Sequence, residues 1–304
     1  MLDERTIAFF VKMTRISIPT TDPRHFDYYV QGLDKYTGSI QTAQLFRTEL
    51  QEKFSNRLDR MEAHGRTVTE SIVRDIRALP GFSDAMQLDI TKSKLSQKDS
   101  LYTPENSGKC FLSIDICKAN YTMLQRQLGT EALCDTWSDL VRRYTDSEFF
   151  IQSKFFRENI FGNLRVTKKT DYLAACLIQE AVLYLNETMG NLNNKIVLQR
   201  GDEVVFQIED KNVAHRIIEQ VHSRYSSDLL KISLFKLTQL APKRAHFVKE
   251  DIDGHAAVQF KHVPKRFIMQ AVKHYEGKPV LETDRLFMDD GEFAMFVNNH
   301  YQAE

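Results

Sequence analysis

Two short stretches of the sequence combine apolar runs with acidic residues. In residues 111–116 an apolar run surrounds Asp115, and in residues 197–206 two apolar runs are joined by a turn at Gly201, Asp202 and Glu203. Apolar runs of this length, bounded by turn residues, are typical of buried strands, and glycine favours a tight turn between two of them. If these strands are neighbours in one sheet, the three carboxylates meet at one edge.

Carboxylates gathered at one edge repel each other unless a cation neutralises them, and the usual cation is a divalent metal. Asp115, Asp202 and Glu203 therefore predict a site for Mg²⁺ or Mn²⁺. Side chains alternate along a strand, so Asp202 and Glu203 cannot both face one ion unless the turn twists them. We expect Asp202 to be the ligand, with Glu203 adjacent or bridging. The alternative is a polar hairpin turn whose acidic pair is solvated.

Composition sets broad limits on the class of protein. The 304 residues suffice for one large or two modest domains, and 41 basic residues balance 41 acidic ones, so no overall charge attracts a partner. The four cysteines have no metal-ligand spacing, which favours reduced thiols in a cytoplasmic protein. No apolar run approaches 18 residues, and the charged N-terminus is unlike a secretory signal, so we expect no membrane segment.

The periodicity of apolar residues predicts a mostly helical region before residue 105. Apolar residues at positions 46, 50, 54, 58 and 61 form one stripe of a single long helix, and a second helix is expected over residues 69–79. Residues 97–109 are polar and contain Pro104 and Gly108, which is typical of a loop and a possible domain boundary.

After this loop the pattern alternates between strands and helices. The expected order is strand 111–116, helix 118–128, an interrupted helical stretch 131–160, helix 170–189, strands 195–199 and 204–208, helix 211–225 and strand 230–237. This is a β-α-β-β-α-β order with extra helices in the first crossover. It predicts an α+β fold with a ferredoxin-like layout.

Residues 108–240 resemble the palm domain shared by nucleic-acid polymerases, GGDEF-type nucleotide cyclases and tRNA-histidine guanylyltransferases. Asp115 corresponds to the aspartate that ends the first palm strand and binds metal, and residues 200–203 are similar to the acidic hairpin turn. The resemblance implies metal-dependent nucleotidyl transfer, with the carbonyl of Ile116 as a backbone ligand. Cyclases carry two glycines before the acidic pair, whereas this chain has Arg200 and Gly201.

Other segments are similar to parts of family B DNA polymerases. Residues 154–162 resemble the finger helix, and the segments around 242–245 and 253–266 resemble the passage from palm to thumb. The resemblance divides the chain into a helical region (1–105), a palm (106–240) with a finger-like insertion (131–190), and a basic thumb-like region (241–304).

Four residues are candidates for nucleotide binding. Lys154 and Arg157 lie three apart on a helix and share a face, where they can clamp a triphosphate; a solvated basic face is the alternative. Asn120 and Tyr121 follow Asp115 closely. The resemblance implies that Tyr121 packs under the sugar, and the alternative is a core aromatic on the first helix.

Residues 231–275 carry nine Lys and Arg against three acidic residues, with aromatic residues and histidines between them. Such a mixture suits a nucleic-acid backbone and its bases, although ordinary surface lysines are the rival interpretation. The residues expected to contact nucleic acid are Lys243, Arg244, Lys261, Lys265 and Arg266.

Three functions remain open at this point. The first is a polymerase-like nucleotidyltransferase that adds a nucleotide from an NTP or dNTP to an RNA or DNA end, with viral or phage replication as the expected context. The second is a palm-fold nucleic-acid-binding protein without catalysis, and the third is a cyclase that makes a nucleotide second messenger. The sequence does not separate RNA from DNA, or templated from untemplated addition.

Overall fold

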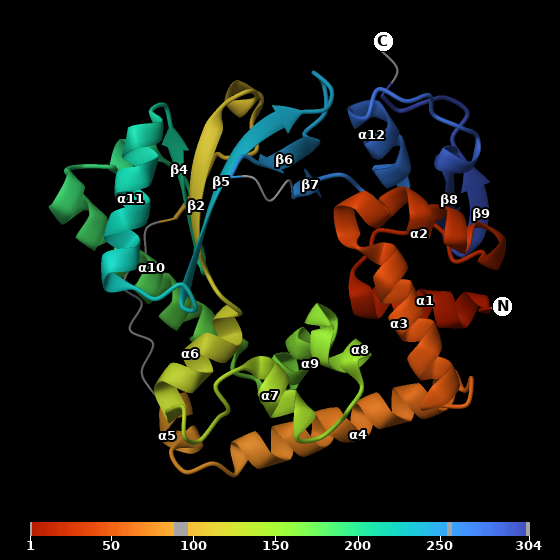
Figure 1. Cartoon of the computed structure of the whole chain (residues 1–304), viewed down its shortest axis with the longest axis horizontal. Coiled ribbons are helices and arrows are strands. Elements are labelled where there is room, and N and C mark those ends of the chain that lie inside the picture. The colour runs from red at the N-terminus through yellow and green to blue at the C-terminus, as the bar shows by residue number, and fades with distance from the viewer. Residues whose placement is uncertain (1, 88–96, 254–256, 302–304) are drawn as a thin grey trace.

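An antiparallel sheet of seven strands organises much of the molecule (Figure 1). This computed structural model describes residues 2–87, 97–253 and 257–301. The strand order is β1-β3-β4-β2-β5-β6-β7, and every neighbouring pair is antiparallel. The strands are β1 (Lys98–Asp99), β2 (Cys110–Ile116), β3 (Ile196–Arg200), β4 (Glu203–Ile208), β5 (Leu230–Gln239), β6 (Phe247–Asp251) and β7 (Val258–Lys261). A separate hairpin pairs β8 (Leu286–Asp289) with β9 (Glu292–Met295).

Helices cover one face of this sheet and build most of the rest of the molecule (Figure 1). Before the sheet lie α1 (Glu4–Thr14), α2 (Pro23–Thr37), α3 (Ser39–Glu52), α4 (Leu58–Arg77) and α5 (Phe82–Gln87). Between β2 and β3 lie α6 (Ala119–Leu128), α7 (Trp137–Arg142), α8 (Glu148–Gln152), α9 (Lys154–Leu164) and α10 (Thr167–Met189). The remaining helices are α11 (Lys211–Arg224) and α12 (Ile268–Tyr275).

The two faces of the sheet have different neighbours because side chains alternate along each strand. From β2, Leu112 and Ile114 pack with α10 and α11 in one buried cluster. Phe111 lies on the opposite face and belongs to a smaller cluster with Val205 and Phe235. Asp115 shares the side of Phe111, so the acidic residue lies on the face that α10 and α11 leave uncovered.

One large core joins regions that are far apart in the sequence. It contains residues of α1–α4, of α6–α9 and of α12, including the fully buried Phe10, Phe46 and Ile160. The N-terminal helices therefore pack directly against the finger-like insertion and the C-terminal region. The division into domains at residues 105 and 240 stays a prediction.

The predicted α+β class is confirmed, and the strands and helices between residues 110 and 239 agree closely with the expected order. The N-terminal helices differ from the prediction. The single helix expected across positions 46–61 is wrong, because the chain leaves α3 after Glu52 and Ser55 and Asn56 adopt left-handed φ angles of 54° and 57°. The helix expected over 69–79 is the second half of α4.

The segment before residue 38 contains two helices that the periodicity did not predict. Each begins at an aspartate: the side chain of Asp3 accepts a hydrogen bond from the amide of Thr6, and that of Asp22 from the amide of Arg24. Across the described part of the chain, none of the helices combines the length and the apolar character that crossing a membrane requires.

Candidate functional site

The acidic residues meet where β2 ends and β4 begins. Asp115 lies opposite Glu203 on β4 and opposite Lys231 on β5. The turn folds back onto the end of β2, because the amide of Ile116 donates a 2.9 Å hydrogen bond to the carbonyl of Asp202. The register thus brings Asp115, Asp202 and Glu203 together at one edge of the sheet.

The local sequence explains the shape of the turn. Arg200 and Glu203 pair across the hairpin, which leaves Gly201 and Asp202 as the two linking residues. Gly201 has a φ of 46°, a left-handed conformation that costs glycine little. The guanidinium of Arg200 also contacts the carboxylate of Asp99 on β1 at 2.6 Å. This ion pair links β3, which precedes the turn, to β1 on its other side.

The carboxylates carry more negative charge than their surroundings neutralise. Burial, followed by the charges of Asp202 and Glu203, raises the pKa of Asp115 to about 7. Burial also raises the pKa of Asp202, with Glu203 adding to the rise and Lys154 opposing it. The pKa of Asp171 in α10 is raised by burial and by the charge of Asp202. A strong upward shift of this kind marks a place where a cation would be stabilised.

Glu203 interacts with a different set of groups from Asp202. The Ser113 hydroxyl donates a 2.6 Å hydrogen bond to Oε1 of Glu203, and Nζ of Lys249 lies 3.9 Å from the same oxygen. The Lys249 ammonium also lies 4.0 Å from the ring centre of Phe235. Burial lowers the pKa of Lys249 and that of Lys261, while the charge of Glu203 opposes both shifts. Glu203 is therefore partly neutralised by lysines of β6 and β7.

A cavity of about 250 Å³ lies between the end of β2 and helices α6 and α9. Asp115 and Asp202 from the β-sheet edge line it together with Lys154 and Arg157 from α9. The remaining lining residues are Ile116, Lys118, Ala119, Asn120, Glu158 and Phe161. Nζ of Lys154 is 3.9 Å from Glu158, and burial lowers the pKa of Arg157. Three cationic side chains (Lys118, Lys154 and Arg157) and three carboxylates (Asp115, Glu158 and Asp202) thus share one small space.

Asn120 and Tyr121 have different locations, although they are adjacent in the sequence. Asn120 lines the cavity, and its side-chain carbonyl accepts a hydrogen bond from the hydroxyl of Thr170. Tyr121 is buried, donates a hydrogen bond to the carbonyl of Cys134 and packs edge-on against Trp137. The contact with a sugar that the resemblance implied for Tyr121 is therefore not supported, and the alternative of a core aromatic describes its position.

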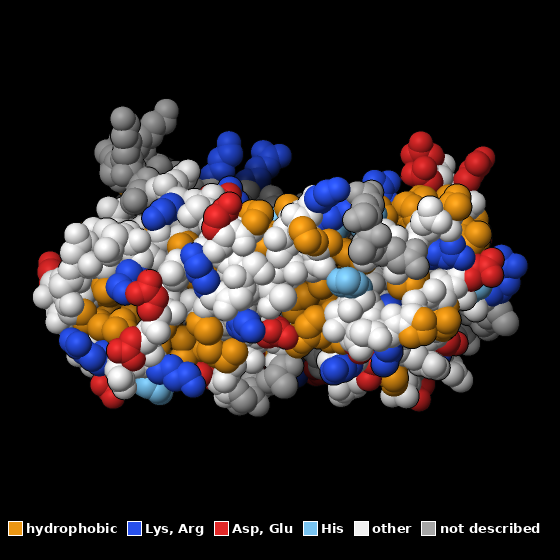
Figure 2. All heavy atoms as spheres, turned by 90° about the horizontal axis from the view of Figure 1, so that it is seen from above, with side chains coloured by type: hydrophobic (Ala, Val, Ile, Leu, Met, Phe, Trp, Pro, Cys, Tyr) orange, Lys and Arg blue, Asp and Glu red, His pale blue; other side chains and the backbone are white. Residues whose placement is uncertain are grey.

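The five basic residues expected to bind nucleic acid lie in three segments of the chain, and their contact with nucleic acid stays a prediction. Lys261 is close enough to the carboxylates for Glu203 and Asp115 to affect its pKa. Lys265 and Arg266 line a separate cavity of about 410 Å³ with Met288 of β8 and with the segment 19–21. Lys243 and Arg244 lie in the turn between β5 and β6. On the face seen in Figure 2, basic side chains are scattered among apolar and neutral ones.

Four residues near the carboxylates were missed as site residues by the sequence analysis. Ser113 and Lys249 contact Glu203, Lys231 lies opposite Asp115, and Asp171 is close enough to Asp202 for its pKa to rise. Ser113 and Lys231 follow from the strand register once the neighbours are known. Asp171 has no local sequence signal, because it reaches the site only through the packing of α10.

The residues present fit a hard divalent cation through their oxygen donors. Asp115, Asp202 and Ile116 line one cavity, and carboxylate and carbonyl oxygens are the ligands that Mg²⁺ and Mn²⁺ prefer. Within residues 2–87, 97–253 and 257–301, no three Asp, Glu, His or Cys side chains are arranged to hold one ion together. The fit therefore rests on two carboxylates, with Glu203 beside them.

The fold and the site together define an α+β protein whose open sheet face ends at an acidic cavity bounded by cationic side chains. Comparison of the chain with protein-family models, with curated proteins and with solved structures found no match.

Proposed function

We propose that this protein is a metal-dependent nucleotidyltransferase that adds a nucleotide from an NTP or dNTP to the end of a nucleic acid. The observation that carries the proposal is the single cavity that Asp115 and Asp202 line together with Lys154 and Arg157. Carboxylates suit a divalent cation, and paired cationic side chains suit a triphosphate. Both halves of a nucleotide–metal complex therefore find complementary groups in one place.

The topology supports a palm-type sheet for this chemistry. The central strands follow the order β3-β4-β2-β5, and the chain connects them as strand, helices, two strands, helix and strand. This is the antiparallel order that a ferredoxin-like β-α-β-β-α-β unit produces. Helices α10 and α11 pack on one face, and Asp115 lies on the other.

Phosphoryl transfer requires that the charge on the phosphate be neutralised and that the attacking and leaving oxygens be held in line. When bound, Mg²⁺ or Mn²⁺ supplies activation of the attacking hydroxyl and charge neutralisation at the triphosphate. In this chain Asp115, Asp202 and the carbonyl of Ile116 would hold the ion. Lys154 and Arg157 would bind and orient the triphosphate, and Arg157 can form two parallel hydrogen bonds to phosphate oxygens.

The lysines of the open sheet face give the nucleic acid a direction of approach. Lys231, Lys249 and Lys261 come from β5, β6 and β7, and all three affect or respond to the charge of Asp115. Lysines along such a face neutralise backbone phosphates without reading the base sequence. We therefore place the acceptor strand over β5–β7, with its end at Asp115.

The test is incorporation of a labelled NTP or dNTP into an oligonucleotide by Asp115→Asn and Asp202→Asn variants, with Mg²⁺ or Mn²⁺ present. We expect each change to lower the rate by at least about a hundredfold, the size typical of losing one electrostatic contact to a transition state. Glu219→Gln is the matched control, because it removes an exposed carboxylate of α11. Activity that persists in both aspartate variants would remove the proposal.

One observation favours a second candidate, a nucleic-acid-binding protein without catalysis. Lys249 already lies beside Glu203, so a side chain neutralises part of the acidic cluster without any metal. This candidate predicts salt-sensitive binding of RNA or DNA that is indifferent to Mg²⁺ and to Asp115→Asn. Turnover of NTP in the absence of any polymer would instead indicate a cyclase.

A further inference from the structure

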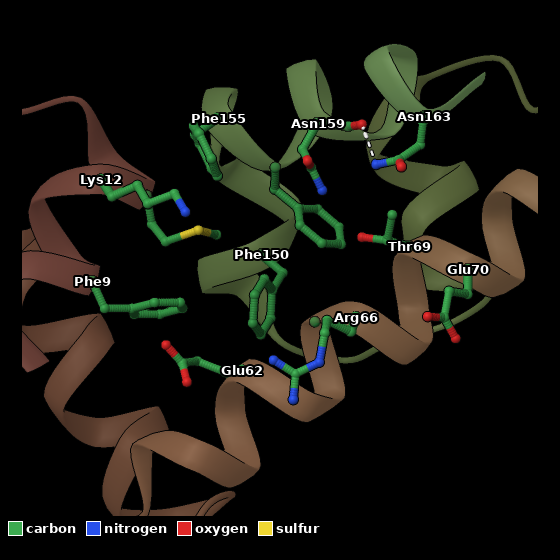
Figure 3. A pocket seen from close by; sticks show the side chains of 13 residues that line it. Phe9, Lys12, Glu62, Arg66, Thr69, Glu70, Phe150, Phe155, Asn159 and Asn163 are labelled. Atoms are coloured by element: carbon green, nitrogen blue, oxygen red, sulfur yellow. Dashed lines mark hydrogen bonds between the residues drawn. The ribbon is translucent and has the colours of Figure 1, made fainter. Parts of the chain in front are cut away.

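A second cavity lies on the opposite side of α9 from the carboxylates, and Figure 3 shows the residues that line it. Its volume is about 450 Å³, and helices α1, α4, α8 and α9 enclose it. Phe155, Phe156, Asn159 and Asn163 of α9 line this cavity, whereas other residues of the same helix line the acidic one. The volume lies in the range of known small-molecule sites.

Aromatic rings form much of the cavity wall. Phe9 and Phe155 are half-buried and border the open space, while Phe150 and Phe156 are buried behind it. The wall depends on Gly65 of α4, because a Cβ atom there would lie 2.8 Å from Cε1 of Phe150. A half-buried phenylalanine ring such as that of Phe9 can accept a planar, aromatic ligand by stacking, whereas the ring of Phe155 already contacts the cationic groups of Lys12 and Arg15 at 5.0 and 4.9 Å.

Polar groups converge on the other end of the cavity, where Asn159, Asn163 and Thr69 lie near one another (Figure 3). The amide nitrogen of Asn163 donates a 2.8 Å hydrogen bond to the backbone carbonyl of Asn159, which leaves the Asn163 side-chain carbonyl as an acceptor. Both asparagines are exposed. A carboxamide offers a donor and an acceptor side by side, the pair that matches the edge of a nucleobase.

The charges at the cavity balance. Lys12 and Arg66 contribute two cations, and Glu62 and Glu70 contribute two carboxylates. The guanidinium of Arg5 contacts Glu62 at 2.5 Å, and the ammonium of Lys12 lies 5.0 Å from the ring centre of Phe155. A cavity with this balance gives a polyphosphate no large advantage over a neutral ring.

We propose that this cavity binds a nucleobase, stacked against Phe9 with its polar edge at Asn159 and Asn163. The ring is recognised, and any sugar or phosphate lies toward the opening. The base can belong to a free nucleoside or nucleotide, or to an unpaired position of a nucleic-acid strand. This proposal does not depend on the nucleotidyl transfer proposed for the acidic cavity, because it uses neither the carboxylates nor a metal.

The experiment is calorimetric titration of the full chain in EDTA, which removes divalent cations and with them metal-dependent binding at the acidic cavity. The probes are adenosine, guanosine, cytidine and uridine, the triphosphate of each, and a short single-stranded oligonucleotide. We expect at least one nucleoside to bind, its triphosphate to bind within about threefold of the same affinity, and Asp115→Asn to leave both unchanged. Asn159→Leu should weaken binding about tenfold or more, the cost of losing a paired contact to a base.

The control is Asn212→Leu, the same change at an exposed position of α11, which should bind as the unaltered protein does. Asn163→Leu is the second variant if Asn159→Leu does not fold. Binding of the oligonucleotide alone, lost in the asparagine variants, would assign the cavity to an unpaired base of a strand. Three results would overturn the proposal: no binding of any probe, binding that Asn159→Leu and Asn163→Leu leave intact, or binding of triphosphates without their nucleosides.

Discussion

The charge of Asp115 should cost the folded protein stability, and replacing this aspartate with asparagine should recover it. The pKa of Asp115 rises from 3.8 to about 7, first because of burial and then because of Asp202 and Glu203. At about 1.4 kcal/mol for each pH unit, this rise corresponds to at most about 4 kcal/mol. Partial solvent access at the cavity screens these charges, so we expect about 2 kcal/mol.

The sign of the effect follows from the two protonation states. Below about pH 4 the carboxyl is protonated in both the folded and the unfolded chain, so Asp115→Asn changes little. Between about pH 4 and pH 7 the unfolded chain releases the proton first, and the unaltered protein loses stability relative to the variant. Above about pH 7 the difference reaches its plateau.

The assay is denaturant or thermal unfolding of both proteins across this pH range. A difference of about 2 kcal/mol in the free energy of unfolding corresponds to a rise in melting temperature of about 4–8 °C for a large domain. Glu219→Gln is the control and should show no such pH-dependent gain. Equal stability of the two proteins above pH 7, or a difference that does not change with pH, would refute the reasoning. Added Mg²⁺ should narrow the gap by stabilising only the protein that retains Asp115.

Two further predictions concern Lys249 and His300. Lys249→Met keeps an apolar stem against Phe235 but removes the ammonium 3.9 Å from Glu203. Removing one nearby positive charge, worth about 1–4 kcal/mol, should raise the affinity for Mn²⁺ at least about fivefold, as measured by electron paramagnetic resonance. Unchanged or weaker Mn²⁺ binding would contradict this prediction. Burial, with the nearby Arg244 charge adding to it, lowers the pKa of His300 to about 4, and its ring stacks 3.6 Å from that of Phe267. Solvent screens the charge of this partly exposed ring, so the protein should lose about 1 kcal/mol as the pH falls from about 6.5 to 4. His300→Phe should lack that loss in acid unfolding, and an identical acid profile would speak against the assignment.

The sheet around the acidic site was predictable because its signals are local. The runs in residues 110–116 and 203–208 are apolar, bounded by turn residues and long enough to exclude most alternatives. Gly201 fixes the hairpin, and the hairpin fixes which acidic residues meet. The roles of Asp115 and Asp202 in binding a metal stay predictions.

The helices before residue 80 were harder to delimit because one apolar stripe crosses a turn. Phe54 lies in the turn after α3 and Leu58 begins α4, yet both are buried, so their spacing continues that of Phe46 and Leu50. The start of α2 does have a local sequence signal, because Asp22 caps the helix and Pro23 occupies its first turn. The periodicity of apolar residues indicates only which positions are buried. Capping residues are also needed to predict where one helix ends and the next begins.

Contacts between distant segments account for the rest. Lys249 reaches Glu203 because β6 joins the sheet beside β5, and Asp171 reaches Asp202 because α10 packs beneath β2. Tyr121 is a helical aromatic whose direction depends on Cys134 and Trp137, which the sequence places in a separate segment. Each outcome was decided by tertiary packing, which no single stretch of sequence specifies.

Helix α9 separates the two cavities: Lys154 and Arg157 line one, and Asn159 and Asn163 line the other. If α9, a helix of 11 residues, moves toward one cavity, it moves away from the other. A ligand that binds in one cavity and displaces α9 would change the affinity of the other cavity for its own ligand. Thermodynamic linkage requires this effect to be reciprocal. Helix α9 would then couple the binding of two ligands that do not contact each other.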